Sequence, residues 1–161
     1  MTTSPKVLSL AEIPAWREDQ RRAGRRLVVT NGCFDLLHTG HIAYLEAARS
    51  QGDLLLIGVN GDASVAALKG PSRPINSEAD RARLLAALAA VDAVTIFPEK
   101  RAGHFLERVR PDVWVKGGDY SLETIDKDER HTVESAGGQI VFIPFLTGKS
   151  TSSLVEKILR L

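Results

Sequence analysis

Short apolar runs rich in β-branched residues alternate along this chain with longer amphipathic stretches, and this alternation constrains the fold more than any other feature. Several runs are apolar on both faces, as strands are in a parallel sheet covered on both sides. The strands expected are Arg26–Thr30, Leu54–Asn60, Ala93–Phe97, Val113–Lys116 and Gln139–Ile143. The pattern predicts an α/β fold with a single doubly wound, Rossmann-like parallel sheet of five strands and helices on both faces.

The segments around these strands have helical spacing and residues typical of helix ends. Gly52 and Gly137 stand where helices commonly end, and Asn76 or Ser77 can cap an Ala/Leu-rich helix. A length of 161 residues fits one domain, with residues 1–25 as an N-terminal extension and helix, residues 1–9 loose, and 26–161 as the main domain. The helices expected are Ile13–Ala23, His41–Gln51, Ala63–Lys69, Ser77–Ala90, Ala102–Arg110, Asp128–Ala136 and Ser152–Arg160.

Charge and cysteine content exclude several classes of protein. The chain has 21 Lys and Arg against 20 Asp and Glu, so the net charge is 21 − 20 = +1. This balance argues against a nucleic-acid-binding protein but permits a local anion site. Cys33 is the single cysteine, so no intrachain disulfide can form. No stretch resembles a signal peptide or a membrane span, and we expect a cytoplasmic protein with no membrane partner.

Ligands of doubly wound folds bind beyond the carboxyl ends of the strands, so the segments that follow each strand are the candidate site. After the first strand there is neither a dinucleotide fingerprint nor a P-loop. Instead, His38 and His41 flank Gly40 at an expected helix start, where free N–H groups and the helix dipole attract anions. The alternatives are a zinc site, for which no further ligand cluster is evident, and ordinary core or capping histidines.

This first segment resembles a known signature. Residues 32–41 match the pattern G-x-F-D-x-x-H-x-G-H of the cytidylyltransferase-like nucleotidyltransferases at all six specified positions. The resemblance implies that His38 and His41 stabilise the α- and β-phosphates of a nucleoside triphosphate. A phosphate oxygen of the co-substrate attacks the α-phosphorus, and pyrophosphate leaves. The implied nucleotide-binding residues of this segment are Asn31, Gly32, Cys33, Phe34, Asp35 and Gly40.

Two of these residues have simpler interpretations that remain open. Asp35 fits an Asx-type turn as well as a direct role, and Cys33 fits a small packed residue because no base is evident beside it.

Later segments add residues for which the resemblance implies roles. Lys69 would contact the triphosphate as a catalytic cation, and Arg81 would point at the phosphates. The alternatives are a helix-end cation for Lys69 and a surface cation for Arg81. The segment 150–152 matches the G-x-S-T-[ST] element that grips the triphosphate, with helix capping as the alternative. The remaining implied residues are Lys116, Gly118, Ser150, Thr151 and Ser152 for the nucleotide and Asp62, Arg73, Asp119 and Tyr120 for the substrate.

The sequence from Lys116 to Tyr120, Lys-Gly-Gly-Asp-Tyr, separates the members of this family, with a plain turn as the alternative. It is similar to the adenylyltransferase domain of ADP-heptose synthases, which join ATP and D-glycero-beta-D-manno-heptose 1-phosphate for lipopolysaccharide biosynthesis. Glycerol-phosphate cytidylyltransferases typically carry an Arg before the G-x-S-T element, and Pro144–Thr147 has none. Lys149 departs from the small or apolar residue that relatives carry there.

The resemblance therefore implies an adenylyltransferase that produces ADP-heptose and pyrophosphate, with Mg²⁺ carried on the triphosphate and no dedicated protein metal site. It also implies a homodimer and a separate sugar kinase. The alternatives are a CTP-dependent cytidylyltransferase acting on glycerol 3-phosphate or another alcohol phosphate, and a non-catalytic nucleotide sensor.

Overall fold

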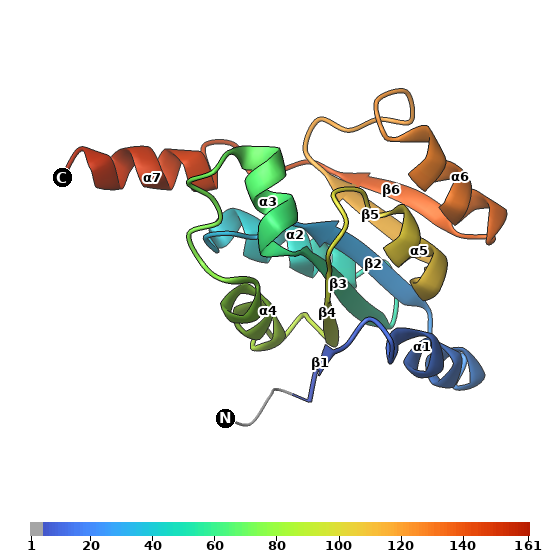
Figure 1. The fold of residues 1–161 in the computed structure, drawn as a ribbon. Helices are drawn as coiled ribbons and strands as arrows, with labels where there is room; N and C mark the ends of the chain where they lie inside the picture. Colours follow the sequence, from blue (N-terminus) through green and yellow to red (C-terminus); the bar gives the residue numbers. More distant parts are fainter. Residues whose placement is uncertain (1–4) are drawn as a thin grey trace.

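A computed structural model describes residues 5–161, and its centre is one parallel sheet with the strand order β1-β4-β3-β2-β5-β6 (Figure 1). All five predicted strands are present, so the α/β doubly wound class is confirmed. The predicted number of strands is wrong, because a sixth strand pairs with β4 at the edge. The strands are β1 Val7–Leu8, β2 Leu27–Gly32, β3 Leu54–Asn60, β4 Ala93–Phe97, β5 Val113–Gly117 and β6 Gln139–Ile143.

The additional strand β1 corrects the expectation that residues 1–9 are loose. Val7 and Leu8 pair with Val94 and Thr95 of β4. A strand of two residues is too short to give a periodic signal in the sequence, which is why it could not be predicted. Residues 1–4, which the same expectation covered, lie outside the described residues.

The pairing of the strands opens the sheet at one point. β2 pairs with β3 over six residues, from Leu27 to Gly32, but it pairs with β5 only at Val28 and Val29. From β2 the chain builds outward to β3 and β4, then returns to the other side of β2 to add β5 and β6. Such a switch in direction leaves a crevice between the carboxyl ends of the two central strands. The crevice therefore lies between β2 and β5.

The described part of the chain contains seven helices, and each predicted helix is found. The largest difference in length is in α4, which ends at Ala86 rather than at the expected Ala90. Beyond that end, the carbonyl oxygens of Leu88 and Val91 accept hydrogen bonds from Lys6 Nζ. The helices are α1 Ile13–Arg22, α2 Thr39–Arg49, α3 Asp62–Lys69, α4 Glu78–Ala86, α5 Gly103–Val109, α6 Lys127–Ser135 and α7 Thr151–Leu159.

Two apolar cores, one on each face of the sheet, hold the helices in place. Tyr44 and Leu45 of α2 join Leu85 of α4 on one face, whereas Ile13 of α1 and Phe105 of α5 pack on the other face, with α6 beside them. Helices on both faces bury β3 completely and most of β2, β4 and β5, whereas the edge strands β1 and β6 remain partly exposed. This packing fixes the start of α2 beside the crevice.

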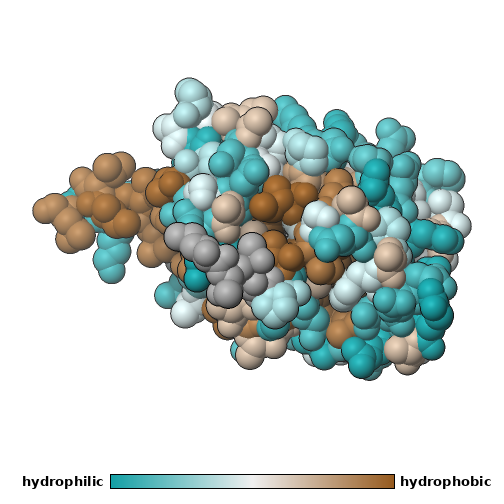
Figure 2. Space-filling model, turned by 60° about the horizontal axis from the view of Figure 1, so that its bottom comes forward, coloured by the Kyte–Doolittle hydropathy of each residue, from teal (hydrophilic) through white to brown (hydrophobic). Residues whose placement is uncertain are grey.

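Helix α7 differs from the others because it has no buried residue and projects away from the sheet (Figure 1). Its surface is largely apolar (Figure 2), with Ile158 60% and Leu159 80% exposed. None of the described helices has the length and apolarity needed to span a membrane.

Candidate active site

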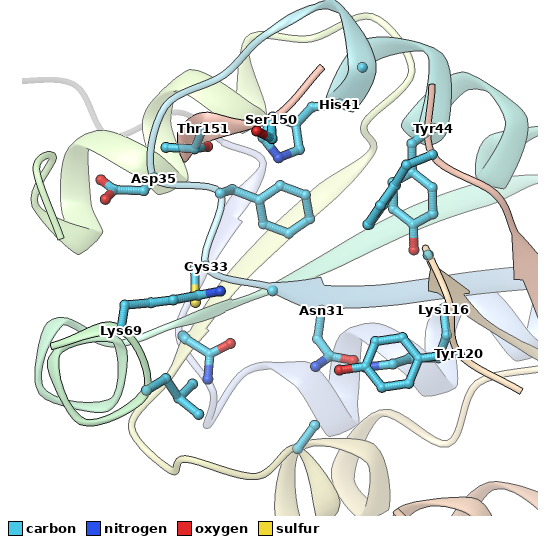
Figure 3. A pocket seen from close by; sticks show the side chains of 18 of the residues that line it. Asn31, Cys33, Asp35, His41, Tyr44, Lys69, Lys116, Tyr120, Ser150 and Thr151 are labelled. Atoms are coloured by element: carbon cyan, nitrogen blue, oxygen red, sulfur yellow. The ribbon is translucent and has the colours of Figure 1, made fainter. Parts of the chain in front are cut away.

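A cavity of about 810 Å³ lies at the carboxyl ends of β2, β3 and β5, where the pairing of the strands predicts a crevice. Its wall contains most of the residues that the sequence nominates (Figure 3). The nominated residues that line it are Asn31, Gly32, Cys33, Phe34, Asp35, His38, Gly40, His41, Lys69, Arg73, Lys116, Tyr120, Ser150, Thr151 and Ser152. The fold therefore gathers four separate segments of sequence into one site.

The two histidines lie at the start of α2. His38 is the N-cap, and its Nδ1 accepts a hydrogen bond from the N–H of Gly40 at 3.1 Å. A neutral His38 therefore carries its proton on Nε2. The ring of His41 lies 3.9 Å from that of His38, centroid to centroid, and its Nδ1 has no hydrogen-bond partner among residues 5–161. An unpaired buried N–H costs free energy, so the proton of a neutral His41 also belongs on Nε2. Both imidazoles thus keep a donor available for a ligand.

Burial keeps His41 neutral. Desolvation, and secondly the neighbouring His38, lower the pKa of His41 to about 4. Burial also lowers the pKa of His38, helped by the charge of Lys149. At neutral pH the pair is uncharged, so it acts on an anion through fixed hydrogen-bond donors in a site that burial has already desolvated.

The depressed pKa of His41 predicts a loss of stability in acid. A histidine takes up a proton with a pKa near 6.5 when unfolded but only near 4 when folded, so the unfolded chain binds more protons between these values. The free energy of unfolding contributed by His41 is complete above pH 6.5 and decreases as pH falls toward 4. Urea titrations between pH 4 and 7 should show a shallower pH dependence for His41→Gln than for the unmodified chain. Parallel curves would show that His41 is solvated.

The start of α7 closes the same corner of the cavity. Ser150 is the N-cap and forms a reciprocal capping box with Ser153, while Thr151 Oγ1 donates a hydrogen bond to the carbonyl oxygen of Leu36 at 3.2 Å. The capping interpretation of Ser150 is therefore confirmed. Lys149 stands over the start of α2, because a Cβ placed on Gly40 would lie 3.0 Å from the Cβ of Lys149. Two helix N-termini and a lysine thus face one space, an arrangement suited to a polyanion.

Asp35 organises the opposite wall rather than facing the ligand. Asp35 is buried, with 3% of its surface exposed. Its carboxylate accepts hydrogen bonds from Arg73 Nε at 2.5 Å and from the N–H groups of Ile75 and Asn76. Burial by itself would raise the pKa of Asp35, but these hydrogen bonds outweigh it and lower the pKa. These donors lie 38 to 41 residues along the chain, so the interpretation as a local Asx-type turn is wrong, and the carboxylate instead holds Arg73 in the cavity wall.

Arg81 does not reach the cavity. It is 1% exposed, so the interpretation as a surface cation is wrong. Its guanidinium donates hydrogen bonds to the carbonyl oxygens of Asn76, Cys33 and Asn60 and pairs with Asp62 at 2.7 Å. Neither Arg81 nor Asp62 lines the cavity, so the structure gives neither of them contact with a ligand there. Helical spacing gave no sign that this arginine is buried.

The end of β5 forms a second arm of the cavity. Lys116 Nζ lies 5.2 Å from the ring of Trp114 and 4.6 Å from the ring of Tyr120, within the range of cation–π contacts. Burial lowers the pKa of Lys116, and the charge of Glu129 opposes that shift. Gly118 and Asp119 do not line this cavity but border a smaller one of about 300 Å³. Gly118 has a φ of +77°, a backbone conformation that favours glycine, so a glycine at this position is explained by the turn.

Cys33 is half-buried in the cavity wall, and burial raises the pKa of its thiol. That direction disfavours the nucleophilic thiolate, in agreement with a packed residue.

Sequence reasoning missed several residues of the wall. Tyr44 bridges the point where β2 and β5 part: its hydroxyl is 2.7 Å from that of Thr30 and donates a hydrogen bond to the carbonyl oxygen of Val115. Lys100 and Arg101 lie in the loop after β4, so the rule that ligands bind beyond strand ends could have found them. Residues of α6 and the segment before it gave no signal of this kind. Lys149, which the sequence singled out either for a phosphate contact or for a place facing water, lines the cavity. The other missed residues of the wall are Asn60, Leu68, Ala102, Gly117, Thr124, Asp126, Glu129 and Phe145.

The donor set of the cavity fits a magnesium ion carried by phosphates. No group of three or more His, Cys, Asp or Glu residues within the described range could hold a metal. Mg²⁺ keeps several waters and binds mainly through substrate phosphates, so it needs no protein cage.

An α/β domain with a phosphate corner built from two imidazoles and two helix N-termini is of the nucleotidyltransferase class, and the comparisons with known proteins agree. A model of the family described as "Cytidylyltransferase-like" matches residues 29–154. The chain belongs to the cytidylyltransferase-like family.

Its relatives carry names that narrow the class. The chain is 51% identical over 143 residues to "Bifunctional protein HldE" of Syntrophotalea carbinolica and 49% identical over 153 residues to that of Geotalea uraniireducens. These alignments cover 88% and 95% of this chain but only 29% and 31% of the relatives, so the chain spans about a third of their length. The crystal structure of the lipopolysaccharide core biosynthesis protein from Thermoplasma volcanium superimposes with a TM-score of 0.62 at 28% identity, covering 78% of this chain and 100% of that one.

Proposed function

We propose that this chain is a heptose 1-phosphate adenylyltransferase, which joins ATP and D-glycero-beta-D-manno-heptose 1-phosphate to give ADP-heptose and pyrophosphate. The observation that carries the proposal is that one cavity is lined both by His38 and His41, which match the nucleotidyltransferase signature, and by residues of the Lys116–Tyr120 segment, which resembles ADP-heptose synthases. The identity of about half to bifunctional HldE proteins supports it, as does the likeness to a lipopolysaccharide core biosynthesis protein.

The reaction proposed is a single in-line displacement. An oxygen of the sugar 1-phosphate forms a bond to the α-phosphorus of ATP, and the bond from that phosphorus to the oxygen leading to the β-phosphorus breaks. Pyrophosphate leaves with that electron pair, and the enzyme forms no covalent intermediate. Such transfer depends on positioning and on neutralising charge rather than on a protein nucleophile.

The residues around His38 and His41 position the phosphates and neutralise their charge. His38 and His41 donate from Nε2 to the α- and β-phosphate oxygens, whose charge increases as the bond breaks. The helix N-termini at Gly40 and Ser150 and the ammonium of Lys149 hold the leaving pyrophosphate. On the opposite wall, Lys69 contacts the triphosphate as a catalytic cation, and Arg73 holds the sugar phosphate beside it. Mg²⁺ bound to the triphosphate would neutralise further charge.

A homodimer in the cytoplasm is part of the same proposal, and a kinase reaction supplies the sugar phosphate.

A panel of substrates tests the proposal. ATP or CTP is offered with heptose 1-phosphate or glycerol 3-phosphate, and pyrophosphate release is measured. Release with ATP and heptose 1-phosphate supports the proposal. Release only with CTP would identify a cytidylyltransferase, and binding of nucleotide without release for any pair would indicate a sensor.

A further inference from the structure

Glu129 is a buried carboxylate in the cavity wall for which the phosphate chemistry has no use. It lies in the first turn of α6, is 8% exposed and lines the cavity. Its Oε1 accepts a hydrogen bond from the N–H of Ala102 at 2.7 Å, where α5 begins. Among residues 5–161 its Oε2 makes no hydrogen bond or ion pair, and the cation on which its charge acts is Lys116. One oxygen thus serves the fold and the other remains available to a ligand.

The other carboxylates of the cavity wall are occupied. Asp35 accepts from Arg73, Ile75 and Asn76, and Asp126 caps α6 and pairs with Arg101. The remaining charged residues of the wall carry positive charge when ionised and suit phosphates. A carboxylate repels a phosphate, so Glu129 Oε2 fits a part of the ligand that carries a hydrogen-bond donor and no phosphate.

The surroundings of Glu129 indicate which part this is. Figure 3 shows Asn31, Lys116 and Tyr120 at the end of the cavity opposite His41, Ser150 and Thr151. Asn31 Oδ1 accepts from Trp114 Nε1 at 3.0 Å, which leaves its amide N–H₂ free to donate. Gly117 and Tyr120 also line this end of the cavity. Tyr120 is 48% exposed, so its ring is accessible to a ligand. This end of the cavity thus offers the aromatic face of Tyr120, the amide donor of Asn31 and the acceptor Glu129 Oε2. These groups match a nucleobase, which is planar and carries an amino group beside ring nitrogen acceptors.

We propose that Glu129 selects the nucleobase, with Oε2 accepting a hydrogen bond from the exocyclic amino group of adenine. The inference rests on the proposed function in taking ATP as the nucleotide. It moves Tyr120, which the sequence assigns to the sugar phosphate, to the nucleoside. A base with an oxo group at the same position presents lone pairs to the carboxylate and is rejected, because two acceptors cannot pair.

The test compares ATP with inosine triphosphate, whose base has an oxo group in place of the amino group. Glu129→Gln keeps an oxygen for Ala102 N–H and turns a donor toward the cavity. Titration calorimetry with the full chain, without sugar phosphate, should show that the unmodified protein prefers ATP by about tenfold or more, the scale of one hydrogen bond to a charged group. Glu129→Gln should shift the ratio of the two dissociation constants at least about tenfold toward inosine triphosphate. Glu134→Gln, an exposed position of the same helix, is the matched control and should not shift it.

Each other outcome has a defined meaning. Equal binding of both nucleotides by the unmodified protein overturns the inference, and this comparison remains valid if Glu129→Gln does not fold. Equal weakening of both nucleotides in Glu129→Gln shows a structural role only. An unchanged ratio with a raised KM for heptose 1-phosphate assigns Glu129 to the sugar instead. Because binding is measured without transfer, an inactive protein that discriminates the two nucleotides contradicts the proposed function but not the role of Glu129.

Discussion

His41→Ala is expected to lower kcat by about 10²–10³, the scale for the loss of one fixed donor to a transition state. The ring is held beside His38 with its Nδ1 buried, so no neighbouring side chain replaces the donor at Nε2. Because the neutral ring makes no hydrogen bond within the described protein, its removal should leave the fold intact. Steady-state kinetics with ATP and heptose 1-phosphate, together with circular dichroism, measure both effects.

The exposed His131 provides the control for this substitution. His131→Ala should retain normal kcat. A near-normal kcat for His41→Ala, with ATP saturating, would remove His41 from the catalytic group and leave phosphate positioning to the helix N-termini.

Arg81→Ala is expected to lower the free energy of unfolding by about 3–5 kcal/mol, the usual cost of removing one partner from a buried charged network. The substitution leaves the carbonyl oxygens of Cys33 and Asn60 without their donor and Asp62 without its cation. Cys33 directly follows β2 and Asn60 is the last residue of β3, and both line the cavity, so the cavity should also lose its shape. Chemical denaturation measures the loss.

Arg83→Ala, two residues along the same helix, is the matched control because Arg83 is exposed. A change within about 0.5 kcal/mol is expected there. If Arg81→Ala were as stable as the unmodified chain but bound ATP poorly, Arg81 would be a phosphate ligand after all, as the resemblance implies.

Local sequence predicted the central sheet because each strand carries its own signal. The run Leu54–Asn60 carries apolar residues on both faces and forms a fully buried strand, and the segment 32–41 lies beyond a strand end, where ligands of such folds bind. The strand Val7–Leu8 could not be predicted, because its pairing with β4 depends on residues 87 positions away.

The site was predicted less completely because burial decides what a charged side chain does. Arg81 and Arg73 look alike in the sequence, yet one is locked among carbonyl oxygens and the other lines the cavity. No sequence motif identified Glu129 as a site residue, because it reaches the cavity only through the packing of α6 beside α5. Such placement follows from tertiary packing, which a single sequence does not display.

The most direct test of the central claim is a competition in one vessel. Equal concentrations of ATP and CTP are mixed with heptose 1-phosphate, Mg²⁺ and the unmodified chain, and the sugar nucleotides are identified by mass spectrometry. The proposed function predicts ADP-heptose as the dominant product, with one pyrophosphate released for each. CDP-heptose as the dominant product, or neither sugar nucleotide, would contradict it.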